Sequence, residues 1–261
     1  MTPSVLGVIP ARLGSTRLPR KPLHPILGRP LLEWVWNRTR SMELFDVLVV
    51  ATDASEVADL CHDIGAPVHL TSSDHPSGTD RVAEVSRLPE YDSFEVVVNV
   101  QGDEPLVDER HLRKAVDLVG SRGGGWDVGT CATPLYHEDA WRNPALVKVV
   151  RACDGRALYF SRASIPAKRD GDVTVEELSK PPFLRHLGIY AYSRESLFRW
   201  VELPPSPLEQ LERLEQLRPL EAGFRVGVAV VDHASAGVDT GEDVARVENE
   251  LSGTGWASPN G

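Results

Sequence analysis

The fold is decided by the stretch Ser4–Pro22, which reads SVLGVIPARLGSTRLPRKP. Its first part, Ser4–Pro10, is an apolar run that predicts a strand ended by proline. The loop that follows contains Gly14, two hydroxyl residues and several cations, a composition that wraps phosphates with backbone N–H groups and positive charge. The loop is neither a Walker A sequence nor a GxGxxG fingerprint. The stretch therefore predicts a first strand that leads into a phosphate-binding loop, with a plain surface loop as the alternative.

Downstream of this loop, strand and helix patterns alternate. Short apolar runs at Val47–Ala51, Val68–Leu70 and Glu95–Val100 predict strands of the kind found inside a parallel sheet. Helices are predicted before, between and after these runs, at 30–40, 54–64, 79–88 and 109–119. Alternation of this kind predicts an α/β fold with a mostly parallel central sheet and helices on both faces. Ligands of such sheets bind beyond the carboxyl ends of the strands, where ARLGSTRLPRK, TDAS and QGDEP fall.

The pattern changes after Cys131. Strands are predicted at 146–151, 158–161 and 187–192, with a proline-rich charged stretch between the last two. We interpret residues 146–222 as an insert that extends the sheet and supplies a dimer surface. Leu208–Leu220 predicts one amphipathic helix, with leucines every three residues facing the core. A strand at 225–231 and a helix at 244–251 complete a single domain, residues 1–251, and residues 252–261 are predicted to be a flexible tail.

Length and composition limit the class of protein. The chain has 261 residues, of which 41% are hydrophobic and 25% charged, as in ordinary globular proteins. The formal net charge of −10 argues against nucleic acid or an anionic membrane as the main partner. No apolar run approaches the length that spans a bilayer, and the N-terminus lacks the features of a secretion signal. Cys61, Cys131 and Cys153 are widely spaced, as buried thiols in a reducing compartment are. We therefore expect a cytoplasmic protein.

The charge is distributed unevenly. Met1–Leu32 contains no Asp or Glu but holds five cations, Arg12, Arg17, Arg20, Lys21 and Arg29. A local basic segment in an acidic protein indicates that a small anion is bound at one place. A solvated basic loop is the other interpretation.

Two aspartates follow predicted strands. Asp103 comes after Glu95–Val100, a good place for a carboxylate to meet Mg²⁺ on a nucleoside triphosphate. Asp239 comes after the last predicted strand. Taken alone, Asp103 is equally well explained as a turn residue, and for Asp239 a turn or helix cap is the better explanation.

The loop sequence IPARLGSTRLPRKPL closely resembles the opening of 3-deoxy-manno-octulosonate (KDO) cytidylyltransferases, whose pattern is IPAR-x-x-STRLP-x-KPL. The resemblance continues, in the expected order, from Val8 to about Val247 through the blocks TD (52–53), SGTDR (77–81), NVQGDEP (99–105), VKVV (147–150), ALYFSRA (157–163), LRHLGIY (184–190), PSPLE (205–209), LEQLR (214–218) and GVDT (237–240). One departure is Arg20, where the family often has glycine.

The resemblance implies a Rossmann-like nucleotide-diphospho-sugar transferase fold and a homodimer that acts in lipopolysaccharide biosynthesis. It implies Mg²⁺-dependent transfer of CMP from CTP to the anomeric hydroxyl of KDO, giving CMP-KDO and pyrophosphate. The implied catalytic residues are Arg12, Lys21, Asp103 and Asp239, with Asp103 and Asp239 as the metal ligands. The implied CTP-binding residues are Pro10, Arg12, Ser15, Lys21, Ser77, Gly78, Arg81 and Gln101. Chemistry at phosphorus needs mainly alignment and charge stabilisation, which a cationic loop and Mg²⁺ supply.

KDO carries a carboxylate and many hydroxyls, so its pocket needs a cation and several hydrogen-bonding groups. Residues in the matching blocks are Arg162, His186, Tyr190, Glu209 and Gln216. His186 is assigned to sugar binding, although a histidine beside an apolar strand is more often a buried hydrogen-bonding residue. Glu209 is equally well explained as a first-turn helix carboxylate.

Three other functions remain open on sequence alone. Sialic acid cytidylyltransferases share the fold and chemistry, but their opening motif lacks the STRLP and KPL found here. Within the KDO interpretation, an amino-substituted KDO as acceptor also stays open. Another nucleotidyltransferase, which uses UTP or a sugar phosphate, is the second. A nucleotide-binding protein without turnover is the third, and the joint presence of Lys21, Asp103 and Asp239 argues against it.

Overall fold

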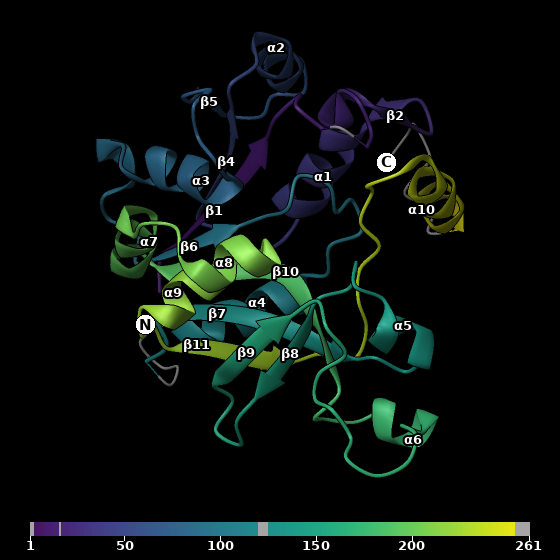
Figure 1. Cartoon of the computed structure of the whole chain (residues 1–261). Helices are drawn as coiled ribbons and strands as arrows, with labels where there is room; N and C mark the ends of the chain where they lie inside the picture. Colours follow the sequence, from purple (N-terminus) through teal and green to yellow (C-terminus); the bar gives the residue numbers. More distant parts are fainter. Residues whose placement is uncertain (1–2, 16, 120–124, 254–261) are drawn as a thin grey trace. The chain divides into compact units, whose positions relative to one another are not determined.

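The computed structural model describes residues 3–15, 17–119 and 125–253 (Figure 1). The fold is mixed α/β with a mostly parallel central sheet, as the alternating pattern predicted. The chain divides into two compact units. The N-terminal unit comprises Ser4–Ser93, Asn99–Glu109 and Ser235–Gly261, and the central unit comprises Met1–Pro3, Phe94–Val98 and Arg110–Ala234. Strand β6 (Val96–Asn99) leads the chain from the central unit back to the N-terminal unit.

The N-terminal unit is built on three parallel strands. Strand β4 (Val47–Thr52) pairs on one side with β1 (Val5–Ala11) and on the other with β5 (Val68–Leu70). Val8 and Ile9 of β1 and Val49–Ala51 of β4 are fully buried because both faces of a parallel sheet are covered. The remaining elements of this unit are the short strands β2 (Pro25–Ile26) and β3 (Arg29–Pro30) and the helices η1 (Lys21–Leu23), α1 (Leu31–Arg40), α2 (Ser55–Asp63), α3 (Gly78–Ser86), η2 (Pro89–Tyr91) and α10 (Gly241–Gly253).

The predicted elements of this unit are confirmed within one to three residues. Helix α2 packs on β4 and β5, and α3 packs on β1 and β4. Ser77 caps α3, since its hydroxyl accepts the N–H of Asp80. Helix α10 continues through Gly253, two residues into the predicted tail, and residues 254–261 of that tail lie outside the described residues.

The central unit contains the remaining strands. Strand β7 (Val128–Pro134) pairs in parallel with β11 (Val226–Val230) and antiparallel with β10 (Leu184–Ser193). Strand β8 (Lys148–Arg151) pairs with β10 and with β9 (Ala157–Ser161), so this hairpin extends the sheet as the insert was predicted to do. The helices of this unit are α4 (Glu109–Val119), α5 (Glu138–Arg142), α6 (Val175–Leu178), α7 (Arg194–Glu202), α8 (Pro207–Glu212) and α9 (Leu217–Glu221).

The prediction of one helix over Leu208–Leu220 is wrong. The chain forms α8 and α9 instead, and Arg213 between them has a left-handed backbone with φ 53°. Leu211 is 80% exposed, whereas Leu214 and Leu217 are buried. A three-residue spacing drifts by about 60° per step around an α-helix, so one straight helix would not hold all the leucines on one face.

Strand β7 and helices α5, α6 and α7 of the central unit were not predicted from the sequence. No helix of the described residues is long and apolar enough to cross a membrane.

Close packing of α4 on β7 gives a test of the central unit. An ideal Cβ placed on Gly129 of β7 would overlap the carbonyl oxygen of Ala115 in α4. We expect Gly129→Ala to lower the free energy of unfolding by about 3 kcal/mol, because backbone would have to move apart. Gly253→Ala is the control, since nothing lies within 4 Å of its Cβ. Chemical denaturation measures both, and a Gly129→Ala protein as stable as the wild type would contradict this packing.

Candidate active site

A lysine and two aspartates meet in the N-terminal unit. The Lys21 ammonium donates to Oδ2 of Asp103 at 2.7 Å and to Oδ1 of Asp239 at 2.6 Å. The Lys21 side chain is only 15% exposed, whereas the two carboxylates are about one-third to two-fifths exposed. Asp103 and Asp239, which lie 82 and 218 positions after Lys21 in the sequence, thus share one cation.

The protonation of Lys21 follows from its neighbours. Burial lowers the pKa of Lys21, but the charges and hydrogen bonds of Asp103 and Asp239 outweigh burial and raise the pKa overall. The side chain is therefore a fixed ammonium at neutral pH. Its charge offsets the repulsion between two carboxylates that face the same point.

Backbone contacts hold the loop of Asp103 against the first strand. Val100 donates its N–H to the carbonyl of Val8, which continues the sheet past β6. At Gly102 an ideal Cβ would lie 2.7 Å from the carbonyl oxygen of Pro10, so the loop approaches β1 this closely only because residue 102 lacks a side chain. Asp103 is thereby placed beside the end of β1, where the cationic loop starts.

The segment that carries Asp239 is fixed from both sides. Val238 donates its N–H to the carbonyl of Asp103 at 2.9 Å. The carboxylate of Asp243, in the first turn of α10, accepts the N–H groups of Asp239 and Thr240. Burial raises the pKa of Asp243, but these hydrogen bonds lower it overall, which keeps the anchoring carboxylate ionised. Asp239 is therefore held by backbone and helix cap together.

Arg17 and Arg20 of the same loop differ in position. Arg17 lies 3.1 Å from Oδ2 of Asp239, so it joins the cluster although the sequence prediction omitted it. Arg20 points to Glu56, at 2.8 Å, and its backbone is left-handed with φ 55°. That conformation suits glycine, which explains why a glycine is compatible with this position in similar sequences.

The other predicted CTP-binding residues surround the ends of β1 and α3. Pro10 packs against Gly78, whose Cβ position lies 3.5 Å from the proline ring. The hydroxyl of Ser15 accepts the N–H of Leu18, which shapes the loop. Gln101 lies between β6 and Asp103. Arg12 is exposed and makes no ion pair with the described residues.

Arg81, which was predicted to bind CTP, is paired with other side chains of the N-terminal unit. Its side chain is buried, and its guanidinium donates to the carboxylate of Asp53 at 2.9 Å and to the hydroxyl of Thr71. Arg81 thus ties α3 to the loops that follow β4 and β5. The contact indicates a positioning role for this residue.

In the central unit, three of the predicted sugar-binding residues share a pocket of about 250 Å³. His186, Tyr190 and Gln216 line it, together with Arg185, Leu214 and the loop Ala145–Val147. The sequence prediction omitted Arg185, although it stands beside His186 in the block that carried the resemblance. The pocket therefore has both a cation and several hydrogen-bonding groups.

Two ionisable groups of this pocket, His186 and Tyr190, are neutral. Burial and then the charge of Arg185 lower the pKa of His186 to about 3, so its imidazole carries no charge at neutral pH. Nε2 of His186 lies 2.9 Å from the Thr130 hydroxyl. Burial, with the charges of Tyr192 and Glu215, raises the pKa of Tyr190 well above its usual value. Arg185 is thus the charged side chain of the pocket lining.

The other two predicted sugar-binding residues are engaged elsewhere. The guanidinium of Arg162 donates to the backbone carbonyls of Glu212, Pro144 and Arg213. Glu209 accepts from Arg218 and from the N–H of Ser206, where it completes a capping box at α8. Neither residue lines the pocket.

A buried lysine supports one wall of the pocket. The Lys148 ammonium donates to the carbonyls of Asn143, Leu146 and Arg162 at 2.6–2.9 Å. Burial and the neighbouring charge of Arg162 lower its pKa. Lys148 fixes the loop before β8, and a lone lysine inside an apolar strand gave no sign of this in the sequence beyond the VKVV block.

The fold and the Lys21 cluster define a nucleotidyltransferase, in which a cationic loop and carboxylates meet at the carboxyl ends of parallel strands. The family model described as cytidylyltransferase matches residues 6–228. A 3-deoxy-manno-octulosonate cytidylyltransferase of Gemmatimonas aurantiaca is 50% identical over 93% of this chain and 92% of its own length. One of Syntrophotalea carbinolica is 44% identical over 96% and 99%.

Solved structures agree. A structure titled as CMP:2-keto-3-deoxy-manno-octonic acid synthetase complexed with CTP is 34% identical, with a TM-score of 0.85 over 96% of this chain and 99% of that one. A 4-diphosphocytidyl-2C-methyl-D-erythritol synthase of Anaerococcus prevotii is 13% identical with a TM-score of 0.61, over 97% of this chain and 100% of that one, and shares the fold alone. The chain belongs to the 3-deoxy-manno-octulosonate cytidylyltransferase family.

The low pKa of His186 predicts an acid-dependent loss of stability. In the unfolded chain the histidine takes up a proton below about pH 6.5, whereas folded His186 stays neutral down to about pH 3. Stability is therefore lost as the pH falls through this window, by about 2 kcal/mol between pH 7.5 and pH 5 from this residue alone. Between these two pH values, the free energy of unfolding of His186→Gln should fall by about 2 kcal/mol less than that of the wild type, as measured by chemical denaturation. His62→Gln, which replaces an exposed histidine, is the control. An equal fall for wild type and His186→Gln would contradict the assignment.

Proposed function

We propose that this chain transfers CMP from CTP to the anomeric hydroxyl of KDO and releases pyrophosphate. The observation that carries the proposal is the cluster of Lys21, Asp103 and Asp239, which combines a phosphate-binding cation with two carboxylates. The relatives at 42–50% identity are named for this activity. The pocket lined by Arg185 and His186 supports an acidic sugar as acceptor.

A Mg²⁺ ion fits the residues present. Asp103 and Asp239 direct carboxylate oxygens to one cation, which is Lys21 in this structure, and Mg²⁺ takes one or two carboxylates with phosphate oxygens and water. When bound, the ion would neutralise phosphate charge and orient the triphosphate. Asp103 and Asp239 are the residues that would hold it.

The cations of the loop bind the triphosphate in this proposal. Asp103 and Asp239 would hold the divalent cation, and Lys21 would contact phosphate oxygens and stabilise the charge on the departing pyrophosphate. Arg12, exposed in the same loop, adds a second contact to phosphate. The sugar hydroxyl attacks the α-phosphorus, the bond to the β-phosphate oxygen breaks, and the hydroxyl proton passes to solvent. No covalent nucleophile is needed.

The base and the sugar are bound by neutral and cationic groups. Gln101 and the backbone at Ser77–Gly78 pair with the polar edge of cytosine. Arg185 binds the KDO carboxylate, and neutral His186 and Gln216 hydrogen-bond its hydroxyls. Neutral His186 suits a hydroxyl ligand because it donates and accepts without adding charge.

The biosynthetic pathway, the cellular location and the oligomeric state are part of the same proposal. The product would feed a glycosyltransferase of lipopolysaccharide biosynthesis. A cytoplasmic location is supported by three free cysteines, of which Cys61 and Cys131 are buried. A homodimer is supported by exposed apolar side chains of the insert, Leu158 and Leu211.

Pyrophosphate release tests the function. With CTP and Mg²⁺, release should occur with KDO and be far slower with N-acetylneuraminate, and 8-amino-KDO tests the amino analogue. Asp103→Asn should lower kcat at least a hundredfold because a ligand of the divalent ion loses its charge. Asp63→Asn, on the exposed face of α2, is the control. Release with another acid alone would move the proposal to that sugar, and undiminished activity of Asp103→Asn would contradict the site.

A second pair of variants tests which arginine binds the sugar. Arg185→Ala should raise KM for KDO about ten- to hundredfold, the size of a lost charge-assisted hydrogen bond, and leave KM for CTP nearly unchanged. Arg162→Ala should mainly lower stability, because it removes a donor from three carbonyls. The opposite result, with KM for KDO raised only in Arg162→Ala, would restore Arg162 as the sugar-binding cation.

A further inference from the structure

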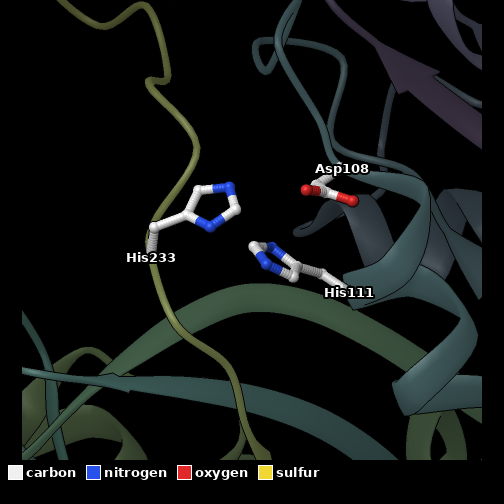
Figure 2. A group of neighbouring side chains, drawn as sticks. All are labelled: Asp108, His111 and His233. Atoms are coloured by element: carbon white, nitrogen blue, oxygen red, sulfur yellow. The ribbon is translucent and has the colours of Figure 1, made fainter.

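A pair of histidines lies in the central unit, at residues that the proposed reaction does not use. His111 belongs to the first turn of α4, and His233 follows β11 in the sequence (Figure 2). Their ring centroids are 4.6 Å apart, with the ring planes inclined by 54°. The His111 side chain is 1% exposed and that of His233 is 46% exposed. One imidazole is thus fixed in the interior, and the other closes over it from the surface.

Carboxylates adjoin both rings. Oδ1 of Asp232 lies 2.9 Å from Nδ1 of His233 and 3.7 Å from Nε2 of His111. Asp108 directly precedes α4, so the start of this helix sets its position three residues before His111. Possible ligand atoms of Asp108, His111 and His233 all lie within 4.8 Å of one another.

This set of donors has a definite chemistry. Imidazole nitrogen and carboxylate oxygen are ligands of zinc and of other first-row divalent cations, and imidazole distinguishes these ions from magnesium. Asp232 at Nδ1 of His233 fixes the tautomer whose lone pair lies on Nε2, as carboxylates do beside metal-binding histidines. Two carboxylates also balance the charge of a divalent cation.

We propose that His111, His233 and Asp108 bind a zinc-class divalent cation, with Asp232 orienting His233. The bound ion links the start of α4 to the segment after β11. Ligands at about 2.0–2.1 Å from zinc lie about 3.3 Å from one another, so the side chains close by roughly 1 Å on binding. His233 is exposed enough for that movement, and buried His111 supplies the fixed position.

The proposed ion is distinct from the one in the active site. Asp103 and Asp239 offer oxygen alone, which suits magnesium, whereas the histidine pair suits a softer cation. Excess Mg²⁺ therefore leaves the histidine site available to zinc. Zinc binding by the histidine pair depends neither on the identity of the sugar nor on turnover.

Zinc binding by the full chain tests the proposal. Protein treated with a chelator is titrated with Zn²⁺ by calorimetry in excess Mg²⁺, and Co²⁺ is added separately to observe its visible absorption. We expect one Zn²⁺ per chain, a rise in melting temperature with Zn²⁺, and a Co²⁺ spectrum of a nitrogen- and oxygen-ligated site. His233→Ala should weaken Zn²⁺ binding at least tenfold and abolish the Co²⁺ spectrum.

Three variants make the result decisive. His62→Ala removes an exposed histidine from α2 and should bind Zn²⁺ as the wild type does. Asp103→Asn should also retain the zinc site, and His233→Ala should retain pyrophosphate release in Mg²⁺. Absence of Zn²⁺ binding by the wild type, unchanged binding by His233→Ala, or loss of binding in Asp103→Asn would each overturn the proposal. In the first two outcomes the cluster is a hydrogen-bonded one without a metal.

Discussion

The N-terminal unit depends on one ammonium group placed between two carboxylates. Lys21 draws together the loop after β1, the loop that carries Asp103 and the segment that carries Asp239. Without that cation the two carboxylates would repel each other at short range in a partly buried place, where charge interactions are stronger than in water. The close approach at Gly102 and the anchoring by Asp243 are what bring the carboxylates there. Backbone geometry thus brings the charged groups together, and the ion pairs offset the repulsion between the two carboxylates that this geometry creates.

The same arrangement connects stability with the proposed chemistry. In the proposed reaction, the ammonium that lies between two carboxylates is the group that would bind the phosphates. Substrate binding would then be an exchange of partners, in which Lys21 leaves Asp103 and Asp239 for phosphate oxygens. Since each charged group keeps a partner before and after, little desolvation energy is lost in the exchange. Arg17, beside Asp239, is close enough to take part in it.

The sequence predicted the elements of the N-terminal unit well because each element has its signal within its own residues. Buried β1 and β4 are uninterrupted apolar runs, and Ser77 marks the start of α3 directly. The leucines of 208–220 misled because spacing alone cannot reveal the left-handed residue Arg213 that divides the segment. Lys21 and Asp103, which the motifs singled out as site residues, lie together in the structure. Motif membership could not separate Arg162, which donates to backbone carbonyls, from its pocket-lining counterpart, because both are cations in the same blocks.

Site cations are hard to identify from motifs because some charged side chains in the same blocks donate to backbone carbonyls. Lys148 and Arg162 donate to carbonyls, and Arg81 joins α3 to two loops, so three cations in family blocks have partners within the protein. A buried cation is costly unless every donor finds an acceptor, and carbonyls of irregular loops are the acceptors that regular secondary structure leaves over. Loops that form a polar pocket are therefore the places where such cations are needed. Arg185 lies on the regular strand β10, whose backbone β7 and β8 already pair, and it lines the pocket.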